Sequence, residues 1–308
     1  MEFASQTVRT LPLSYDIIRT IHARAVELCI PRRVGKAAVL HAHSGICTAQ
    51  LLQAKRHGST VICDHRSRFP GHAGENDPLA NRLRQEFDAA DYILTSSALA
   101  RSDFLDRGFP AEKVVAIPLG VSTDRFVPRE QARRLETPSR IFFAGRISYL
   151  KGVDLILRAA KRLGPQYQFR LAGTIRDAEV LHDGIPGNVR ILGQLTQEAL
   201  QEEFHNSHLL VLPSRSDAFG LVAVEAMATG LPVIISDSCG VADAVALNSA
   251  GAVFPDSDID AFINSVQELL KDSHEYARLQ HNALTTAKQH SWRAYGNRVV
   301  QLYKERIL

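Results

Sequence analysis

Short apolar runs rich in Val, Ile and Phe alternate with longer segments of helical periodicity along most of the chain. Strands buried on both faces read as continuous apolar runs, and parallel strands need a crossover, usually a helix, between them. The alternation therefore predicts an α/β fold with parallel sheets covered by helices. Four strands are expected in the first half, at 38–43, 59–64, 91–97 and 113–120, and six in the second half, at 140–145, 167–173, 189–193, 208–214, 231–237 and 251–255.

A charged segment between Pro128 and Pro138 carries no strand pattern and predicts a linker over 127–138. It separates two doubly wound, Rossmann-like domains at 1–126 and 139–290, and a terminal helix over 291–308 is expected to pack back toward the first domain. Ligands of such sheets bind beyond the carboxyl ends of the strands, so two facing sheets would place the site in the cleft between them.

The charge balance narrows the choice of partners. The 308 residues are 45% hydrophobic and 22% charged, with a net charge of +3, which is typical of a soluble globular protein and does not indicate a nucleic-acid partner. Residues 1–135 hold 19 Lys and Arg against 14 Asp and Glu, whereas the remainder holds 17 against 19. The basic first half suits an anionic substrate or peripheral contact with a membrane surface, and it equally suits an ordinary solvated face.

Targeting segments and cysteines both bear on the cellular compartment. The opening "MEFASQTVRTLPLSYD" lacks a basic start followed by an apolar core, and no apolar run approaches ~18 residues, so neither a signal peptide nor a spanning helix is predicted. The four cysteines, Cys29, Cys47, Cys63 and Cys239, have no paired spacing and indicate neither a disulfide framework nor a metal cluster. We expect a cytoplasmic protein, at most peripheral at the inner face of the membrane.

The first candidate site is "FAGRISYLKGVDLILRAAKRL", in which an expected strand ends at Gly145 and a loop carries Arg146 and Lys151 into an amphipathic helix. A guanidinium offers planar two-point contact and an ammonium a point charge, so the pair can clamp a diphosphate. The alternative is two solvated cations beside a turn.

The second is "PSRSDAFGLVAVEAMATGLPV", in which a strand ends at Pro213 and a helix is expected to begin near Phe219 or Gly220. A glycine lets backbone amides approach a ligand closely, and a helix N-terminus attracts phosphate. Asp217 precedes the helix and is either part of a ligand site or simply the helix N-cap. Glu225, inside the helix, either accepts hydrogen bonds from two ribose hydroxyls or faces solvent.

The third is "TVICDHRSRFP", where His65 follows an expected strand. Histidine titrates near neutrality, so His65 is a candidate hydrogen-bond donor to a sugar or a proton carrier; its alternative is a merely polar filler. His41 and His43 share one strand face, but no third ligand lies nearby in sequence, so a zinc site is not predicted.

With these motifs in place, the chain resembles the retaining group 1 (family 4) glycosyltransferases of the GT-B fold, which use nucleotide-sugar donors. The resemblance covers about 41–303 and is most specific in "SRSDAFGLVAVEAMATGLPVIISD", two acids around a Phe-Gly-Leu turn. "FAGRISYLKGVDLILRAA" is similar to the family's Gly-Arg and Lys-Gly element. "EFDAADYILTSSALARSDFLDRGFPAEKVVAIPLGVSTDRFVP" and "SWRAYGNRVVQLYKERI" are similar to its domain-closing segment and final helix.

The resemblance implies roles for the donor-side residues. Arg146 and Lys151 would neutralise the donor diphosphate, and Glu225 would hold the ribose. The phosphate would bind amides of the Phe-Gly-Leu turn, which is formed by Phe219, Gly220 and Leu221. Catalysis would involve two residues, with Asp217 facing the hydroxyls of the transferred sugar and His65 lying beside the donor sugar. Family members need no metal and no cofactor.

Two departures from the family pattern stand out. The family usually has Glu where this chain has Asp217, which draws the carboxylate back toward the backbone. The family's first domain opens with a strand and a glycine-rich loop, whereas residues 1–36 read as a helical lead-in, so a shortened first domain is predicted.

The expected function is a metal-independent hexosyl transfer, with retention, from a nucleoside-diphosphate sugar to a carbohydrate or lipid-linked acceptor. The expected context is polysaccharide, lipopolysaccharide or glycolipid synthesis in the cell envelope. The competing hypothesis is a catalytically inactive, glycosyltransferase-like binding or regulatory protein that lacks a complete acceptor domain. Donor binding without turnover would favour the binding or regulatory protein over the enzyme.

Overall fold

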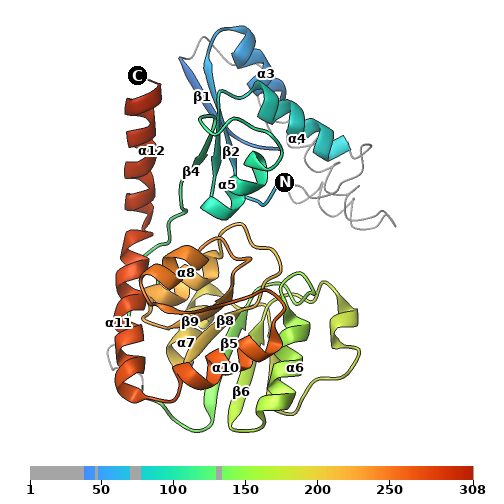
Figure 1. The fold of residues 1–308 in the computed structure, drawn as a ribbon, viewed down its shortest axis with the longest axis vertical. Helices are drawn as coiled ribbons and strands as arrows, with labels where there is room; N and C mark the ends of the chain where they lie inside the picture. Colours follow the sequence, from blue (N-terminus) through green and yellow to red (C-terminus); the bar gives the residue numbers. More distant parts are fainter. Residues whose placement is uncertain (1–37, 46–47, 70–77, 130–133, 308) are drawn as a thin grey trace. The chain divides into compact units, whose positions relative to one another are not determined.

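The computed structural model describes residues 38–45, 48–69, 78–129 and 134–307. Packing contacts divide the chain into two compact units, each built around its own sheet (Figure 1). The first unit extends to Ala116 except for Ser97–Leu99, which pack with the second, and the second unit runs from Ile117 to Arg306.

The first unit contains a four-stranded parallel sheet in the order β1-β2-β3-β4. Within the described residues this order follows the chain without reversal. Its core is aromatic: the rings of Phe87 and Phe104 lie 4.9 Å apart, edge to face, and Phe69 packs on both. The elements are β1 (Val39–His43), α3 (Thr48–Arg56), β2 (Thr60–His65), α4 (Pro78–Ala89), β3 (Tyr92–Thr95), α5 (Ala98–Leu105) and β4 (Val114–Ala116).

The second unit contains a six-stranded parallel sheet in the order β10-β9-β8-β5-β6-β7. Chain order reverses between the neighbouring strands β5 and β8, which makes this sheet doubly wound and places its topological switch point there. The strands are β5 (Ser139–Ala144), β6 (Tyr167–Ala172), β7 (Val189–Gly193), β8 (Leu209–Leu212), β9 (Val233–Ser236) and β10 (Gly251–Phe254).

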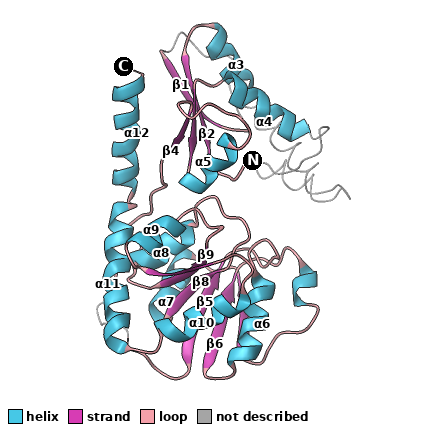
Figure 2. Ribbon diagram, in the orientation of Figure 1, coloured by secondary structure: helices cyan, strands magenta, loops and turns pink. Residues whose placement is uncertain are grey.

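Helices cover this second sheet because its central strands have no polar face (Figure 2). Every residue of β8 and β9 is buried, as expected for parallel strands covered on both sides. The helices assigned to this unit, not all of which lie on the sheet, are α6 (Val153–Leu163), η1 (Ala178–Leu181), α7 (Gln197–Asn206), α8 (Leu221–Ala228), α9 (Ala242–Leu247), α10 (Ile259–Leu269), α11 (Ser273–Gln289) and α12 (Trp292–Arg306).

The segment that precedes the linker is tied to the start of the terminal helix within the second unit. The Val121 amide donates to the carbonyl of His290 (2.8 Å), and the Trp292 amide donates to the carbonyl of Val121 (3.3 Å). A Cβ on Gly120 would lie 2.5 Å from the Cα of Trp292. The packing unit therefore begins at Ile117, upstream of the expected linker. The predicted domain limits and the packing of α12 on the first domain stay predictions.

All ten expected strands form, with their ends shifted by a few residues. The largest shift is at β4, which ends at Ala116 rather than 120, two residues before Pro118, which has no amide to donate to a ladder. Cys63 and Cys239 are buried free thiols. Cys29, Cys47 and the helical lead-in at 1–36 lie outside the described residues. In the part of the chain that the structure describes, no helix is long and apolar enough to cross a membrane.

Candidate functional site

The switch point of the second sheet brings two loops into backbone contact. One follows β5 and contains Gly145 and Gly152; the other follows β8 and begins at Pro213. Gly152 has φ +68°, and a Cβ there would lie 1.9 Å from the carbonyl oxygen of Pro213. Gly173, at the end of β6, likewise approaches the carbonyl of Gly145 too closely for a side chain. Glycine is therefore required where the loops meet, at the edge where doubly wound sheets bind ligands.

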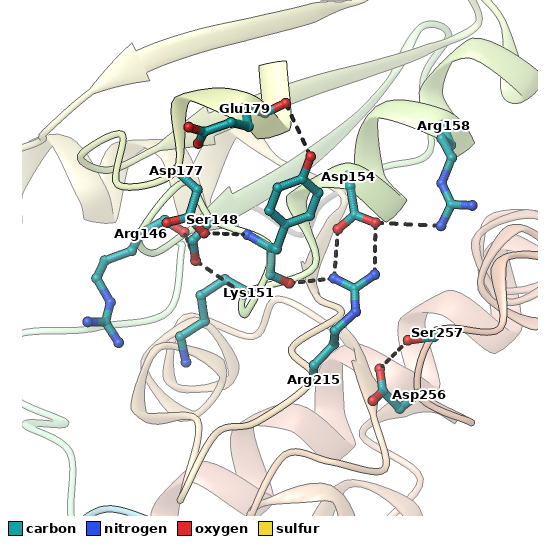
Figure 3. A network of polar contacts seen from close by, with 11 residues as sticks. Arg146, Ser148, Lys151, Asp154, Arg158, Asp177, Glu179, Arg215, Asp256 and Ser257 are labelled. Atoms are coloured by element: carbon teal, nitrogen blue, oxygen red, sulfur yellow. Dashed lines mark hydrogen bonds and ion pairs between the residues drawn. The ribbon is translucent and has the colours of Figure 1, made fainter. Parts of the chain in front are cut away.

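The two predicted cations lie on the first of these loops. The Nζ of Lys151 is 2.6 Å from Oδ2 of Asp217, and their side chains are only 15% and 19% exposed. Arg146 is exposed, and its guanidinium forms no hydrogen bond or ion pair with any described residue. Figure 3 shows the Arg146 and Lys151 side chains extending the same way from the loop. One cation is thus held in place and the other is available.

Asp217 combines the two interpretations that the sequence left open. Its Oδ1 accepts the backbone amides of Gly220 (2.9 Å) and Phe219 (3.2 Å), so it stabilises the turn that leads into α8. Its Oδ2 accepts from Lys151. Its own backbone is held between the Ser238 carbonyl (3.1 Å) and the Gly240 amide (3.0 Å). The carboxylate therefore occupies a position where an ammonium and two amides converge.

Helix α8 begins at Leu221, one residue after the expected start, because Gly220 takes the left-handed conformation (φ 86°) as its N-cap. A side chain on Gly220 is excluded, since its Cβ would lie 2.4 Å from Sγ of Cys239. The amides of Leu221 and Val222 belong to the first turn and cannot be paired within the helix. Phe219 is buried (3%), whereas Leu221 is 38% exposed.

Glu225 lies one turn farther along α8 and is partly buried. Burial raises the pKa of its carboxyl to about 7, and the positive charge of Arg125 acts in the opposite direction. Its carboxylate makes no hydrogen bond or ion pair with the residues that the structure describes. An unpaired carboxylate that has lost water is stabilised by any donor that a ligand brings, such as a pair of hydroxyls.

His65 lies in the first unit, as the last residue of β2, and is 5% exposed. Its Nε2 is 3.3 Å from the carbonyl of Arg68, which can only accept, so Nε2 carries the proton and Nδ1 accepts from the Ser44 hydroxyl (2.8 Å). Its ring packs edge-on against Phe87 and Phe104. Burial lowers the pKa of the imidazole to about 4. A substrate would have to replace Ser44 or Arg68, and the catalytic role stays a prediction.

Sequence reasoning did not single out Arg215 and Asp154, which lie between the predicted residues in the second unit. The Arg215 guanidinium forms two parallel bonds to the Asp154 carboxylate, at 2.7 and 2.8 Å. The signal was present as an Arg two residues before Asp217 and an Asp three residues after Lys151. Charges on a loop and on a helix that are 61 positions apart cannot be paired from one sequence. No cluster suited to a metal ion occurs among the described residues.

Comparison with known proteins agrees with this geometry. The family model described as "Glycosyl transferases group 1" matches residues 124–286, and the one described as "Glycosyltransferase Family 4" matches residues 6–125. D-inositol 3-phosphate glycosyltransferase 2 of Catenulispora acidiphila is 29% identical over 247 residues, which cover 72% of this chain and 58% of that protein. The chain thus matches little more than half the length of this relative.

Two solved structures have the same fold. Sucrose-phosphate synthase from Thermosynechococcus elongatus aligns with a TM-score of 0.76 at 23% identity, covering 96% of this chain and 81% of that one. Anabaena Alr3699/HepE, solved in complex with UDP and glucose, aligns with a TM-score of 0.72 at 15% identity, covering 94% and 81%. Because the group 1 model spans more than half of the chain, the chain belongs to the group 1, family 4 glycosyltransferases, and its two parallel-sheet units are those of the GT-B fold.

Proposed function

We propose that the protein transfers a sugar from a nucleoside-diphosphate donor to an acceptor hydroxyl, with retention of the anomeric configuration and without a metal ion. One observation carries the proposal. At the switch point of the second sheet, the Lys151 ammonium and the amides of Phe219 and Gly220 converge on a single carboxylate, that of Asp217. An ammonium and helix-start amides aimed at one anionic group form an arrangement that also suits a phosphate.

The donor would exchange contacts with this carboxylate. Its diphosphate would take the Lys151 ammonium and amides of the turn formed by Phe219, Gly220 and Leu221. Arg146, whose guanidinium has no partner among the described residues, would supply a second cation. Its ribose would donate to the Glu225 carboxylate, one turn along the same helix. Asp217, released from Lys151, would face the hydroxyls of the transferred sugar. Negative charge develops on the leaving diphosphate, so preorganised cations there stabilise the transition state without a divalent ion.

For the acceptor, we propose classes of molecule rather than one compound. The expected acceptors are carbohydrates or lipid-linked sugars in polysaccharide, lipopolysaccharide or glycolipid synthesis, and the protein would act in the cytoplasm, at the membrane surface for a lipid-linked acceptor. The names of relatives such as D-inositol 3-phosphate glycosyltransferase 2 add an inositol phosphate to this list. A basic first half would attract either an anionic acceptor or an anionic membrane surface.

The donor side is tested by calorimetric titration of the full chain with UDP, GDP and ADP. We expect one of them to bind, and binding to weaken about a hundredfold in Lys151→Ala, because a charge-assisted bond contributes about 1.5–3 kcal/mol. Absence of binding to all three, or binding that is unchanged in Lys151→Ala, would contradict the proposal.

The reaction is tested by incubation with the matching nucleotide sugar, with and without EDTA. The acceptor panel contains D-inositol 3-phosphate, oligosaccharides and polyprenyl-linked sugars. We expect one acceptor to be glycosylated equally with EDTA, and NMR of the product to show the donor's anomeric configuration. Tight donor binding without hydrolysis or transfer would instead support the competing hypothesis of a binding or regulatory protein.

A further inference from the structure

Besides the Lys151–Asp217 ion pair, Arg215 joins the loop that carries Lys151 to the loop that carries Asp217. Its backbone amide donates to the Leu150 carbonyl (2.9 Å), and its guanidinium also donates to the Tyr149 carbonyl. Arg215 is thus hydrogen bonded to the two residues that precede Lys151 on the first loop. On the second loop, Arg215 itself lies two residues before Asp217.

The same guanidinium anchors this junction to a rigid element. Asp154, in the first turn of α6, receives both parallel bonds from Arg215, as Figure 3 shows. The pair is partly shielded, with side chains 31% and 19% exposed. A planar fork fixes orientation as well as distance, which a lysine at this position would not do. The buried residues of helix α6 are all apolar, so core packing as well as the two loops holds Asp154 in position.

These contacts bear on the proposed anion site, which is the point where the Lys151 ammonium and the amides of Phe219 and Gly220 converge. Lys151 alone would be a flexible ammonium on a loop, and the amides of Phe219 and Gly220 lie on a different loop. Their convergence on one point requires the two loops to keep a fixed spacing. The backbone approach at Gly152 sets a lower limit to that spacing, because Gly152 already touches Pro213. The bonds of Arg215 set the upper limit.

We propose that Arg215, held by Asp154, is a positioning residue that keeps the Lys151 ammonium and the helix-start amides directed at one diphosphate. This inference rests on the proposed function, since it assigns a role within the same donor site. Arg215 would not touch the donor. Its loss should therefore weaken the contact with the diphosphate and leave the contact with the nucleoside, which depends on Glu225.

The experiment compares Arg215→Gln and Asp154→Asn with a matched control. Arg170 on β6 forms a bidentate pair with Glu203 on α7, with side chains 28% and 15% exposed, in the same unit and within a similar environment. Arg170→Gln removes an equivalent pair outside the two loops. Arg158→Gln is a second control, because Arg158 also contacts Asp154 (3.6 Å) but lies on α6 alone.

Affinity is measured by calorimetry for whichever of UDP, GDP and ADP binds the wild type, and by ligand-observed NMR for the corresponding nucleoside. We expect Arg215→Gln and Asp154→Asn to weaken diphosphate binding about tenfold, about 1.4 kcal/mol, and nucleoside binding less than about twofold. Arg170→Gln and Arg158→Gln should leave both affinities unchanged, while Arg170→Gln lowers the melting temperature as much as Arg215→Gln. The exchange Arg215→Asp with Asp154→Arg should recover part of the diphosphate affinity.

The positioning role is wrong if Arg215→Gln binds the diphosphate as well as Arg170→Gln does, or if diphosphate and nucleoside affinities fall together. Lys151→Gln separates this failure from that of the proposed function. If Lys151→Gln weakens the diphosphate and Arg215→Gln does not, only the positioning role fails. If neither variant matters, or the wild type binds none of the three diphosphates, the anion site itself is wrong and the positioning role falls with it.

Discussion

The carboxyl ends of the strands differ between the two units in how their polar side chains are satisfied. In the first unit, both ring nitrogens of His65 are hydrogen bonded, and the fully buried Glu86 accepts the Gly45 amide (2.6 Å) and the Thr48 hydroxyl. In the second unit, Arg146 and Glu225 have no partner among the described residues. Polar groups paired within the protein stabilise it, whereas unpaired ones at a switch point are free to bind a ligand.

The contrast also appears in the pKa values. Burial lowers the pKa of the His65 imidazole to about 4 and raises that of the Glu225 carboxyl to about 7, so both groups resist their charged form. The hydrogen bonds of His65 suit its neutral form, because each ring nitrogen has a partner. The Glu225 carboxylate has no hydrogen-bond donor among the residues that the structure describes. Desolvation therefore favours a neutral, hydrogen-bonded side chain in the first unit, and in the second unit it favours a carboxyl that hydroxyl donors of a ligand would stabilise as the carboxylate.

The largest effect should come from removing both cations of the loop that follows β5, Arg146 and Lys151. We expect Arg146→Ala with Lys151→Ala to weaken nucleoside-diphosphate binding about a thousandfold, near 4 kcal/mol, because each charge-assisted bond contributes about 1.5–3 kcal/mol. Titration calorimetry measures this. Lys161→Ala, which removes an exposed cation at the far end of α6, serves as the control. Equal weakening in Lys161→Ala would mean that general charge, not the switch point, attracts the ligand.

The next effect is on stability, through Glu225. Its folded pKa of about 7 lies above the usual value of 4.5, so the carboxyl is neutral and costs no charge burial below about pH 4.5, whereas stability is lost as the pH rises from there through about 7. Glu225→Gln should therefore match the wild type near pH 4.5 and be more stable by up to about 3 kcal/mol above pH 7. Thermal melts between pH 4 and 8 measure the difference.

An exposed glutamate on α10 provides the control for that experiment. Glu268→Gln should show no such pH-dependent gain, since Glu268 is 69% exposed. Nucleoside binding to the wild type should also tighten as the pH rises through 7, because hydroxyl donors favour the carboxylate, and this dependence should disappear in Glu225→Gln. A pH-independent difference between variant and wild type would refute the assignment of the titrating group.

A smaller effect is expected in the first unit. His65→Phe keeps an aromatic ring in the cluster but leaves the Ser44 hydroxyl without its acceptor, so we expect a loss of about 1–2 kcal/mol in the free energy of unfolding. Denaturant titration measures it. Nucleoside-diphosphate affinity should be unchanged. The loss of stability as the pH falls from about 6.5 to about 4 should diminish, because the buried imidazole that resists protonation is gone.

The same variant sharpens the catalytic prediction. If His65→Phe folds and binds the donor normally but its turnover drops by about a hundredfold or more, then His65 contacts the substrate during the reaction. Its hydrogen bonds within the first unit are then not its only role. Unchanged turnover would leave His65 with its structural role alone.

The smallest effect should come from Asp217→Asn. The amide oxygen can still accept from Phe219 and Gly220, but the neutral side chain no longer competes with a diphosphate for Lys151. We expect UDP, GDP or ADP, whichever binds, to bind about threefold to tenfold more tightly, while transfer becomes slower. Weaker binding in Asp217→Asn would show that the carboxylate supports the anion site rather than occupying it.

Much of the architecture could be predicted because its causes are local. All ten strands follow from continuous apolar runs, and the start of α8 follows from Gly220 within one residue. Arg146, Lys151 and Glu225 could be singled out as candidates because sites of parallel sheets follow strand ends, which a sequence displays, and their roles stay predictions. The domain limits and the opening of the first domain stay predictions, since they fall partly on 1–37 and 130–133, outside the described residues.

The strands, the helices and the candidate side chains can therefore be predicted from the sequence alone, because periodicity and turn residues act over a few positions. The tertiary structure decided which groups meet. It paired Lys151 with Asp217 across 66 positions and Arg215 with Asp154 across 61, and it enclosed His65 among phenylalanines. The physical reason is that hydrogen bonding and desolvation depend on neighbours in space, which a chain acquires only when the strand order of its sheet is set.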